Sequence, residues 1–406
     1  MKIVQINAVC GSGSTGRICL EIMDYINNSK DDECVLFFGN GNPSDKSGAF
    51  IMNTPNCVKF HGLMARLMGK AAYFSHFHTK KLISQLKKIK PDIVHLHNLH
   101  GNYVHLNMLL QYLAKNDIPT VITLHDCWFF TGKCTHYTVD GCYKWQTECH
   151  DCPRLKKDIP SWFFDCTKKM WHDKKEFFEA IPRLAVIGVS DWITNEAKKS
   201  FLKNAKIIKR IYNWIDLDTF YPRKDDISAQ YGLDPTKFHV LLIGAGWHEN
   251  SAKFKDMLKL SEALGDDIQI ILAGTVHDNV GLPKNVVTIG YINGTDELAK
   301  VYSYADAYVH LSYEDTFGKV IAEAMACGTP AVVYDSTACA ELVPENCGYS
   351  VKPGDINAVK EKISEIKNST KAHYSEDCIK HVKNNFEKNM LIEDTLSLYK
   401  KLINQE

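Results

Sequence analysis

The sequence lacks any uninterrupted apolar run near the length of about 18 residues that a membrane-spanning helix requires. It also lacks a recognisable secretion signal, because the opening MKIVQINAVCG has only a few apolar residues before a glycine-rich loop. The sequence therefore predicts a cytoplasmic protein. In a reducing compartment, its 14 cysteines are expected to be buried thiols or metal ligands rather than disulfides.

A net charge is missing as well, since 48 Lys and Arg residues balance 48 Asp and Glu residues. Proteins that neutralise a nucleic-acid backbone usually carry an overall basic surface, so no nucleic-acid partner is expected. The chain has 406 residues, which predicts two or three domains. No residue-level internal repeat is evident.

Short apolar runs alternate with amphipathic segments such as 103–115, and the runs have the length and composition of buried parallel strands. The expected strands are 2–9, 34–38, 92–97, 120–125 and 184–189, then 239–246, 268–274, 286–292, 307–312 and 330–335. The predicted fold class is α/β, with two Rossmann-like domains in tandem. Ligands of open α/β sheets bind beyond the carboxyl ends of the strands, so we expect the two domains to face a central cleft.

The segment IYNWIDLDTFYP (211–222) separates the two series of strands and ends in a proline, so we place the hinge there. We expect an N-terminal domain at 1–212, with a cysteine-rich insert at 127–153. A C-terminal domain at 213–385 follows, and a final helix within 386–406 is expected to cross back to the N-terminal domain.

The clearest local pattern is HLSYEDTFGKVIAEAMACGTPAVV at 310–333. A strand, an acidic loop and a helix from about Lys319 follow one another, and Gly328 and Pro330 end that helix. The helix start presents backbone amides and the positive end of the helix dipole, which suits a diphosphate. A carboxylate one or two turns further along can accept both hydroxyls of a ribose. The alternative is a solvated acidic loop before an ordinary helix.

This motif resembles that of the retaining family-four glycosyltransferases with the GT-B fold, in which a Glu, seven residues and a second Glu follow one another. The resemblance extends over nearly the whole chain, to the subset that assembles capsule, exopolysaccharide and colanic-acid-like polysaccharides. It implies that Glu323 binds the donor ribose and that Asp315, with the amides around Phe317 and Gly318, holds the transferred sugar. The helix start at Gly318 and Lys319 would stabilise the diphosphate. Asp315 stands where the family has its first Glu, and Glu314 is the only other candidate, so the shorter side chain of Asp315 leaves the sugar contact open.

The resemblance also implies site residues in the first domain. His125 matches a histidine that touches the primary hydroxyl of the donor sugar, although a lone histidine is more often structural. We expect His97 and Asn98 to line the acceptor side, with plain packing as the alternative. Gly13 and Gly16 match a glycine-rich turn that lies close to the donor phosphates. A dinucleotide site would need an acid at the end of the second strand, and that strand has none.

The second domain lacks the Arg and the Lys-Gly pair with which the family binds donor phosphates. Lys253 is the nearest substitute and Lys255 the next, while a surface lysine is the alternative interpretation of each. The D-x-D tripeptide at Asp216 and Asp218 is interpreted as structural. We therefore expect metal-independent catalysis that requires no cofactor.

The insert carries four cysteines in a polar loop that has too little apolar content to form a core. Four thiolates within about 20 residues match a structural tetrahedral zinc site. The expected ligands are Cys134, Cys142, Cys149 and Cys152. Reduced thiols, an iron centre and disulfides are the alternatives.

Together these features predict a retaining glycosyltransferase of the hexosyltransferase type. Its donor would be a nucleotide sugar, with UDP-sugars the commonest choice in the family, and its acceptor a hydroxyl of a glycan or lipid-linked glycan in polysaccharide biosynthesis. The stretches 58–90 and 156–178 mix lysines with apolar residues, as do helices that lie on anionic membranes and many ordinary surface helices. Peripheral attachment to the inner face of a membrane is thus a hypothesis. A nucleotide-sugar epimerase of the same fold and a non-catalytic nucleotide-sugar-binding protein are the alternative functions.

Overall fold

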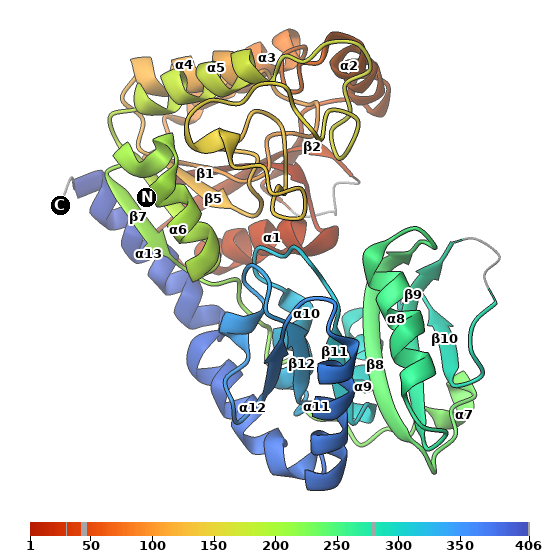
Figure 1. The fold of residues 1–406 in the computed structure, drawn as a ribbon. Coiled ribbons are helices and arrows are strands. Elements are labelled where there is room, and N and C mark those ends of the chain that lie inside the picture. Colours follow the sequence, from red (N-terminus) through yellow and green to blue (C-terminus); the bar gives the residue numbers. More distant parts are fainter. Residues whose placement is uncertain (30, 42–46, 278–280, 405–406) are drawn as a thin grey trace. The chain divides into compact units, whose positions relative to one another are not determined.

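The computed structural model describes residues 1–29, 31–41, 47–277 and 281–404. The chain forms two compact units, and each unit is built on a parallel sheet with helices (Figure 1). Unit 1 comprises Met1–Ile211 and the residues from Ile392 onward, and unit 2 comprises Tyr212–Leu391. The predicted α/β class is confirmed. Asn42, which follows the second predicted strand, and residues 405–406 of the predicted C-terminal segment lie outside the described residues.

Unit 1 is built on a seven-stranded sheet in which all neighbouring strands are parallel. Its strands are β1 Lys2–Val9, β2 Glu33–Asn40, β3 Ala49–Ile51, β4 Ile93–Leu96, β5 Thr120–Leu124, β6 Leu184–Gly188 and β7 Ile207–Arg210. Their order is β3-β2-β1-β4-β5-β6-β7. β4 and β5 are buried along their whole length, as expected for parallel strands that helices cover on both faces.

The helices of unit 1 cover the central strands β4 and β5 of the sheet, which are buried. They are α1 Gly13–Asn27, α2 Pro55–Met68, α3 His76–Ile89, α4 Leu106–Lys115, α5 Thr167–Glu179, α6 Asp191–Lys199 and the short 3-10 turns η1 Lys144–Gln146 and η2 Phe201–Asn204. In Figure 1, α3, α4 and α5 lie on one side of this sheet and α1 and α6 on the other. The last helix, α13 (Lys388–Asn404), is anchored to the sheet because the Tyr399 hydroxyl lies 2.6 Å from Nδ1 of His95.

Unit 2 is built on a six-stranded parallel sheet of order β10-β9-β8-β11-β12-β13. Its strands are β8 Phe238–Trp247, β9 Ile268–Val276, β10 Val286–Gly290, β11 Ala307–His310, β12 Ala331–Tyr334 and β13 Gly348–Val351. Its helices are α7 Ser228–Tyr231, α8 Ala252–Ala263, α9 Thr295–Tyr304, α10 Lys319–Ala326, α11 Ile356–Ser369, α12 Ala372–Asn385 and the turn η3 Ala340–Leu342.

All ten strands expected from the sequence are present, with ends that shift by up to two residues. Three further strands, β3, β7 and β13, are not predicted by the apolar pattern. Each of them lies at the edge of its sheet, and each has only three or four residues. An edge strand has one unpaired side and is partly exposed, so it needs no continuous apolar run.

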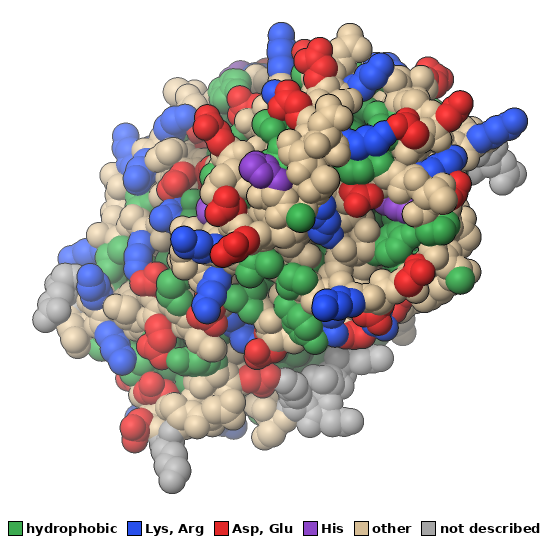
Figure 2. Space-filling view, turned by 90° about the horizontal axis from the view of Figure 1, so that it is seen from below, with side chains coloured by type: hydrophobic (Ala, Val, Ile, Leu, Met, Phe, Trp, Pro, Cys, Tyr) green, Lys and Arg blue, Asp and Glu red, His purple; other side chains and the backbone are tan. Residues whose placement is uncertain are grey.

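The charged side chains are mixed on the surface. On the face in Figure 2, Lys and Arg side chains alternate with Asp and Glu side chains, which agrees with the balanced composition. Within the described ranges, no helix has both the length and the apolar character needed to cross a bilayer.

Candidate active site

The motif at 310–333 forms the end of β11, a loop and helix α10, as the sequence predicts. Gly318 is the N-cap of α10 and has φ +82, a left-handed conformation that glycine adopts without strain. A Cβ atom at this position would lie 2.8 Å from Cδ1 of Ile321. Gly318 brings no side-chain oxygen to the first-turn amides, so the helix start keeps the polarity that attracts anions.

Asp315 is held in a chain of hydrogen bonds at the end of β11. Its Oδ2 lies 2.8 Å from Nε2 of His310, and Nδ1 of His310 lies 2.9 Å from the Tyr308 hydroxyl. The Thr337 hydroxyl accepts from the Asp315 amide at 2.8 Å and donates to the Asp315 carbonyl at 2.6 Å. Side chain and backbone are thus both fixed. The sequence analysis missed His310, although a histidine at the end of a strand five residues before Asp315 was a usable signal.

His310, Asp315 and Cys339 bring three potential metal-ligand atoms within 4.8 Å of one another. The His310–Asp315 hydrogen bond accounts for two of them. Burial, followed by the Asp315 charge, raises the pKa of the Cys339 thiol well above its ordinary value, which keeps it protonated and a poor ligand. The group is therefore better interpreted as a hydrogen-bonded cluster than as a metal site.

Lys253 lies beside this cluster. Its Nζ packs at the carboxyl end of β8, where a Cβ at Gly244 would meet it at 2.9 Å, and lies 4.8 Å from the ring centroid of Trp247. Burial lowers the pKa of Lys253, and the Asp315 carboxylate opposes that shift. Lys255 is exposed instead. Of the two candidates, Lys253 is the one that lies close to Asp315 at this strand end.

Helix α8, which carries Lys253, is fixed to the motif by a buried carboxylate. Asp256 is 4 % exposed, and it accepts hydrogen bonds from the hydroxyls of Tyr313 at 2.6 Å and Tyr334 at 2.8 Å. Tyr313 belongs to the motif loop and Tyr334 to β12. Asp256 therefore sets where Lys253 stands relative to Asp315.

Glu323 and Phe317 are less accessible than the sequence analysis expects. Glu323 lies on the second turn of α10, is 2 % exposed, and accepts a hydrogen bond from the Tyr302 hydroxyl at 3.2 Å. Phe317 is also 2 % exposed and packs against Tyr212 and Phe386, so only its backbone is placed to meet a ligand. Lys319 is half-buried at the helix start.

The unit 1 candidates cluster where β4 and β5 end. His125 follows β5, and its Nε2 lies 3.0 Å from Nδ1 of His97, which follows β4. Burial lowers the pKa of His125 to about 4, although Asp126 acts in the opposite direction, so His125 is neutral near pH 7. His97 is 0 % exposed, which fits the alternative of plain packing better than a place on the acceptor side. Its ring supports His125 from within the sheet.

The other unit 1 candidates differ in accessibility. Asn98 is half-buried, and its backbone N–H donates to Oδ1 of Asn7 at 3.1 Å. Gly13 has φ +63 and is exposed, and a Cβ there would meet nothing within 4 Å. Gly16 is buried, and a Cβ there would lie 3.1 Å from the Gly11 amide nitrogen. The predicted phosphate contact therefore fits Gly13 only, because Gly16 is used in packing the loop.

Two family models divide the chain between them. The model described as Glycosyltransferase Family 4 matches residues 29–219, and the model described as Glycosyl transferases group 1 matches residues 223–385. The chain belongs to glycosyltransferase family 4. This family-4 glycosyltransferase uses a nucleotide-sugar donor, and enzymes of its family are typically metal-independent.

A relative with matching length is the protein named putative colanic acid biosynthesis glycosyl transferase WcaC from Escherichia coli. It is 23% identical over 370 residues, which cover 88% of each chain. Among solved structures, sucrose-phosphate synthase from Thermosynechococcus elongatus superposes with a TM-score of 0.70 at 17% identity, over 100% of both chains. HepE from Anabaena in complex with UDP gives 0.66 at 15% identity, over 99% of this chain and 100% of that one. These likenesses confirm the GT-B fold.

The D-x-D tripeptide of this family-4 glycosyltransferase is engaged in local contacts. Asp216 accepts from the Asp218 amide at 3.3 Å and pairs with Lys388 at 3.0 Å. These bonds fix the turn that follows the first residues of unit 2.

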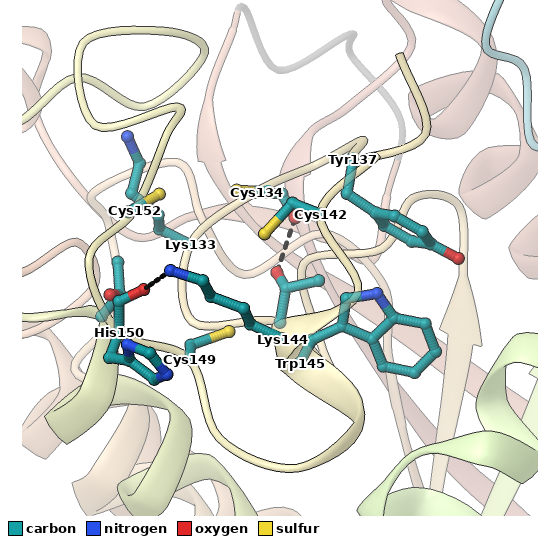
Figure 3. Close-up of a pocket in the computed structure, with 11 residues that line it drawn as sticks. Lys133, Cys134, Tyr137, Cys142, Lys144, Trp145, Cys149, His150 and Cys152 are labelled. Carbon is teal, nitrogen blue, oxygen red and sulfur yellow. Dashed lines mark hydrogen bonds between the residues drawn. The ribbon is translucent and has the colours of Figure 1, made fainter. Parts of the chain in front are cut away.

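The cysteine-rich insert lines one pocket with all four of its predicted zinc ligands, together with Lys133, Lys144 and His150 (Figure 3). In Figure 3 the Lys144 ammonium reaches the backbone oxygen of His150, 3.0 Å away, beside Cys149. Within the described part of the chain, the only group of three or more ligand atoms within 4.8 Å is the one at His310. The prediction of a tetrahedral zinc site at Cys134, Cys142, Cys149 and Cys152 is therefore not supported. All 14 cysteines are free thiols.

The insert has a small apolar core of its own. Trp145 and Tyr137 are each 1 % exposed, and their rings lie 5.1 Å apart. Two buried lysine side chains also donate hydrogen bonds to backbone carbonyls of the insert, which has little regular secondary structure. Lys133 donates to the carbonyls of Arg154 and Leu155 at 2.8 and 2.9 Å, and Lys174 donates to Trp128 and Thr131 at 2.6 and 2.9 Å. The premise that this loop is too polar to hold itself was wrong.

We predict that the purified protein carries no stoichiometric zinc, because no three of the four cysteine sulfur atoms lie within 4.8 Å of one another. Metal analysis of the native protein should give less than about 0.1 zinc per chain, and thiol titration after unfolding should recover all 14 cysteines. One zinc per chain, lost together with folding on chelation, would contradict this prediction.

Proposed function

We propose that this glycosyltransferase moves a hexose from a UDP-sugar to a hydroxyl of a glycan or lipid-linked glycan in polysaccharide assembly, with retention of the anomeric configuration. The observation that carries the proposal is the site at the end of β8 and β11. There Lys253, the start of α10 and the fixed Asp315 carboxylate lie within one unit. The complex of HepE with UDP supports the base, and the name of WcaC supports polysaccharide assembly.

The proposed reaction needs no covalent nucleophile. The leaving diphosphate takes the proton of the acceptor hydroxyl on the same face of the sugar, through an oxocarbenium-like transition state. The protein then has to orient the reactants and stabilise the negative charge that grows on the diphosphate. Lys253 and the start of α10 have the required polarity. Gly13 of unit 1 offers the open turn that a phosphate could approach.

Asp315 can take part despite its shorter side chain. One oxygen, Oδ2, is bonded to His310 at 2.8 Å, which orients the carboxylate as a unit. We propose that Asp315 binds a hydroxyl of the transferred sugar, that Glu323 binds the ribose, and that His125 and Asn98 of unit 1 serve the sugar and the acceptor. For Glu323, the buried position means that the ribose has to meet the carboxylate in a largely desolvated setting.

We predict that Glu323→Gln lowers kcat/KM for the donor by roughly 10–200-fold, because a neutral amide cannot accept both ribose hydroxyls as a carboxylate does. The amide oxygen can still accept from Tyr302, so the fold is retained. Transfer is measured with a panel of nucleotide sugars, and thermal unfolding is recorded alongside.

The matched control for that substitution is Glu361→Gln on the exposed side of α11, which should leave both quantities unchanged. A decrease of less than twofold in Glu323→Gln would remove Glu323 from the site. Conversion of one nucleotide sugar into its epimer in the absence of any acceptor would show an epimerase instead.

We also predict that turnover survives removal of divalent cations, because the charge on the diphosphate is met by Lys253 and the start of α10. EDTA at a concentration above that of all metal in the assay should change kcat by less than about twofold. Activity abolished by EDTA and restored by magnesium or manganese would contradict metal-independent catalysis.

We further propose that unit 1 attaches to an anionic membrane surface, where lipid-linked acceptors reside. Helix α2 buries only Ala65 among its 14 residues, although half of its residues are apolar. Phe60 and Leu63 are 59% and 42% exposed and follow each other at helical spacing. A soluble helix normally turns such residues inward, so the outward apolar face of α2 suits a lipid surface.

A neighbouring loop extends this apolar surface. The Trp162 amide donates to the Arg66 carbonyl at 2.7 Å, which places the loop against α2, and Phe163 and Phe164 are 69% and 54% exposed. Between residues 47 and 91 the sequence has eight Lys and Arg residues and no Asp or Glu. Each cation near an anionic bilayer contributes about 1 kcal/mol, so the charge of this region favours such a surface.

Co-sedimentation with vesicles tests the membrane proposal. The protein should sediment with phosphatidylglycerol vesicles at low salt, and less with phosphatidylcholine vesicles or at high salt. The double substitution Phe163→Ser and Phe164→Ser should weaken binding by roughly tenfold. Tyr291→Ser, which removes a 65%-exposed aromatic side chain from unit 2, should not. Absence of sedimentation with either vesicle, or salt-independent binding to both, would contradict the proposal.

A further inference from the structure

A chain of hydrogen bonds inside unit 1 starts at a backbone carbonyl. Gln5 of β1 is 0 % exposed, and its Nε2 donates to the Cys19 carbonyl at 2.9 Å. Because a carbonyl oxygen only accepts, the amide nitrogen has to face it, and Oε1 has to face the other way. Oε1 lies 3.1 Å from Nε2 of His97. The backbone therefore fixes which end of Gln5 meets the histidine.

The direction of the next two bonds follows from this orientation. The amide oxygen of Gln5 can only accept, so Nε2 of His97 carries a proton. Burial, followed by the neighbouring His95 and His125, holds the pKa of His97 well below its ordinary value, so the ring is neutral and its Nδ1 has a lone pair. That Nδ1 lies 3.0 Å from Nε2 of His125, which therefore has to donate.

The geometry of the two rings agrees with such a bond. Their planes are 19° apart and their centroids 5.3 Å apart, with the 3.0 Å contact between the nitrogens. A centroid separation this much longer than the N···N distance puts both nitrogens between the two centroids. The hydrogen bond therefore runs close to both ring planes, where an N–H points and a ring lone pair accepts.

We propose that Gln5 and His97 are positioning residues that hold His125 in the tautomer with the proton on Nε2, so that Nδ1 of His125 accepts a hydrogen bond from a hydroxyl of the transferred sugar. The second half rests on the proposed function, whereas the first half concerns unit 1 alone. A donor whose hydroxyl at this position is methylated has no proton to give, so it should be a poorer substrate than the hydroxyl form.

His95 provides a matched control because it lies outside this chain. Its Nδ1 is 2.6 Å from the Tyr399 hydroxyl and its Nε2 is 2.7 Å from the Thr123 hydroxyl. Like His97, it is a buried imidazole, 1 % exposed, and it lies within β4 with its ring centroid 4.0 Å from that of His97. Replacing either histidine by Leu removes a buried hydrogen-bonding ring at nearly constant volume, but only His97→Leu removes the acceptor for His125.

Nitrogen-15 NMR of histidine-labelled full-length protein, without ligand, reads the tautomer directly. His125→Asn identifies the His125 signals, which should show a protonated Nε2 and an unprotonated Nδ1 in the wild type. His97→Asn places an oxygen near the former Nδ1 and should keep that pattern. His97→Leu should give a mixture of tautomers, and His95→Leu should resemble the wild type.

Kinetics complete the test. Because one oriented hydrogen bond is lost, we expect His97→Leu to lower kcat/KM about tenfold. His97→Asn should restore kcat/KM to within about threefold of wild type, and His95→Leu should change it less than about twofold.

A wild-type His125 protonated on Nδ1 would overturn the proposal, as would a His97→Leu spectrum with an unchanged tautomer. If His97→Leu does not fold, the wild-type and His97→Asn spectra still decide. Expected spectra without transfer from any donor would overturn the proposed function and the sugar contact, and leave the tautomer assignment standing.

Discussion

The cost of burying a polar group without a hydrogen-bond partner shapes the candidate site residues in both units of this glycosyltransferase. A parallel sheet covered on both faces has no water near its central strands, so a polar side chain there has to be satisfied by its neighbours. In unit 1 the buried side chains of Gln5 and His97 are hydrogen-bonded to each other. Their orientation determines which nitrogen of His125 donates to His97. In unit 2 the buried Asp256 does so by accepting from two tyrosines. The residues that we propose to face the ligand are thus oriented by buried neighbours.

This dependence explains how the site can tolerate its departures from the family pattern. A shorter carboxylate at Asp315 would be loosely placed if it projected alone from a loop. Here His310 is hydrogen-bonded to the Asp315 carboxylate, and Thr337 is hydrogen-bonded to both the amide and the carbonyl of Asp315. The shorter side chain is therefore held in one orientation. Lys253 likewise lies one turn before Asp256 on α8, and in the proposed site this anchoring would let a single lysine take a place usually given to two cations.

The sequence predicted the fold class and the central strands because burial on two faces demands continuous apolar runs, such as those of β5 and β12. It could not predict β3, β7 and β13, since edge strands are stabilised by pairing on one side and their composition is mixed. Within the site, motif spacing pointed to Asp315, Gly318 and the start of α10, all of which depend on local chain geometry. Accessibility was harder. His97 and Gly16 have the residue types of a binding site, yet tertiary neighbours bury them.

The cysteine-rich insert shows why composition can mislead about stability. Four cysteines in a polar segment favour a metal when nothing else can offset the entropy of ordering the loop. In this protein the partners come from outside the segment: Lys174 of α5 donates hydrogen bonds to loop carbonyls, and the Nε1 of Trp171 donates to the Trp145 carbonyl at 2.9 Å. A sequence window cannot reveal such partners, because they lie more than 20 residues away. The same holds for Gln5, which lies 92 positions from the histidine that it orients. In both cases the residues that fix the insert or orient the histidine have types that, taken alone, indicate only an ordinary strand or helix.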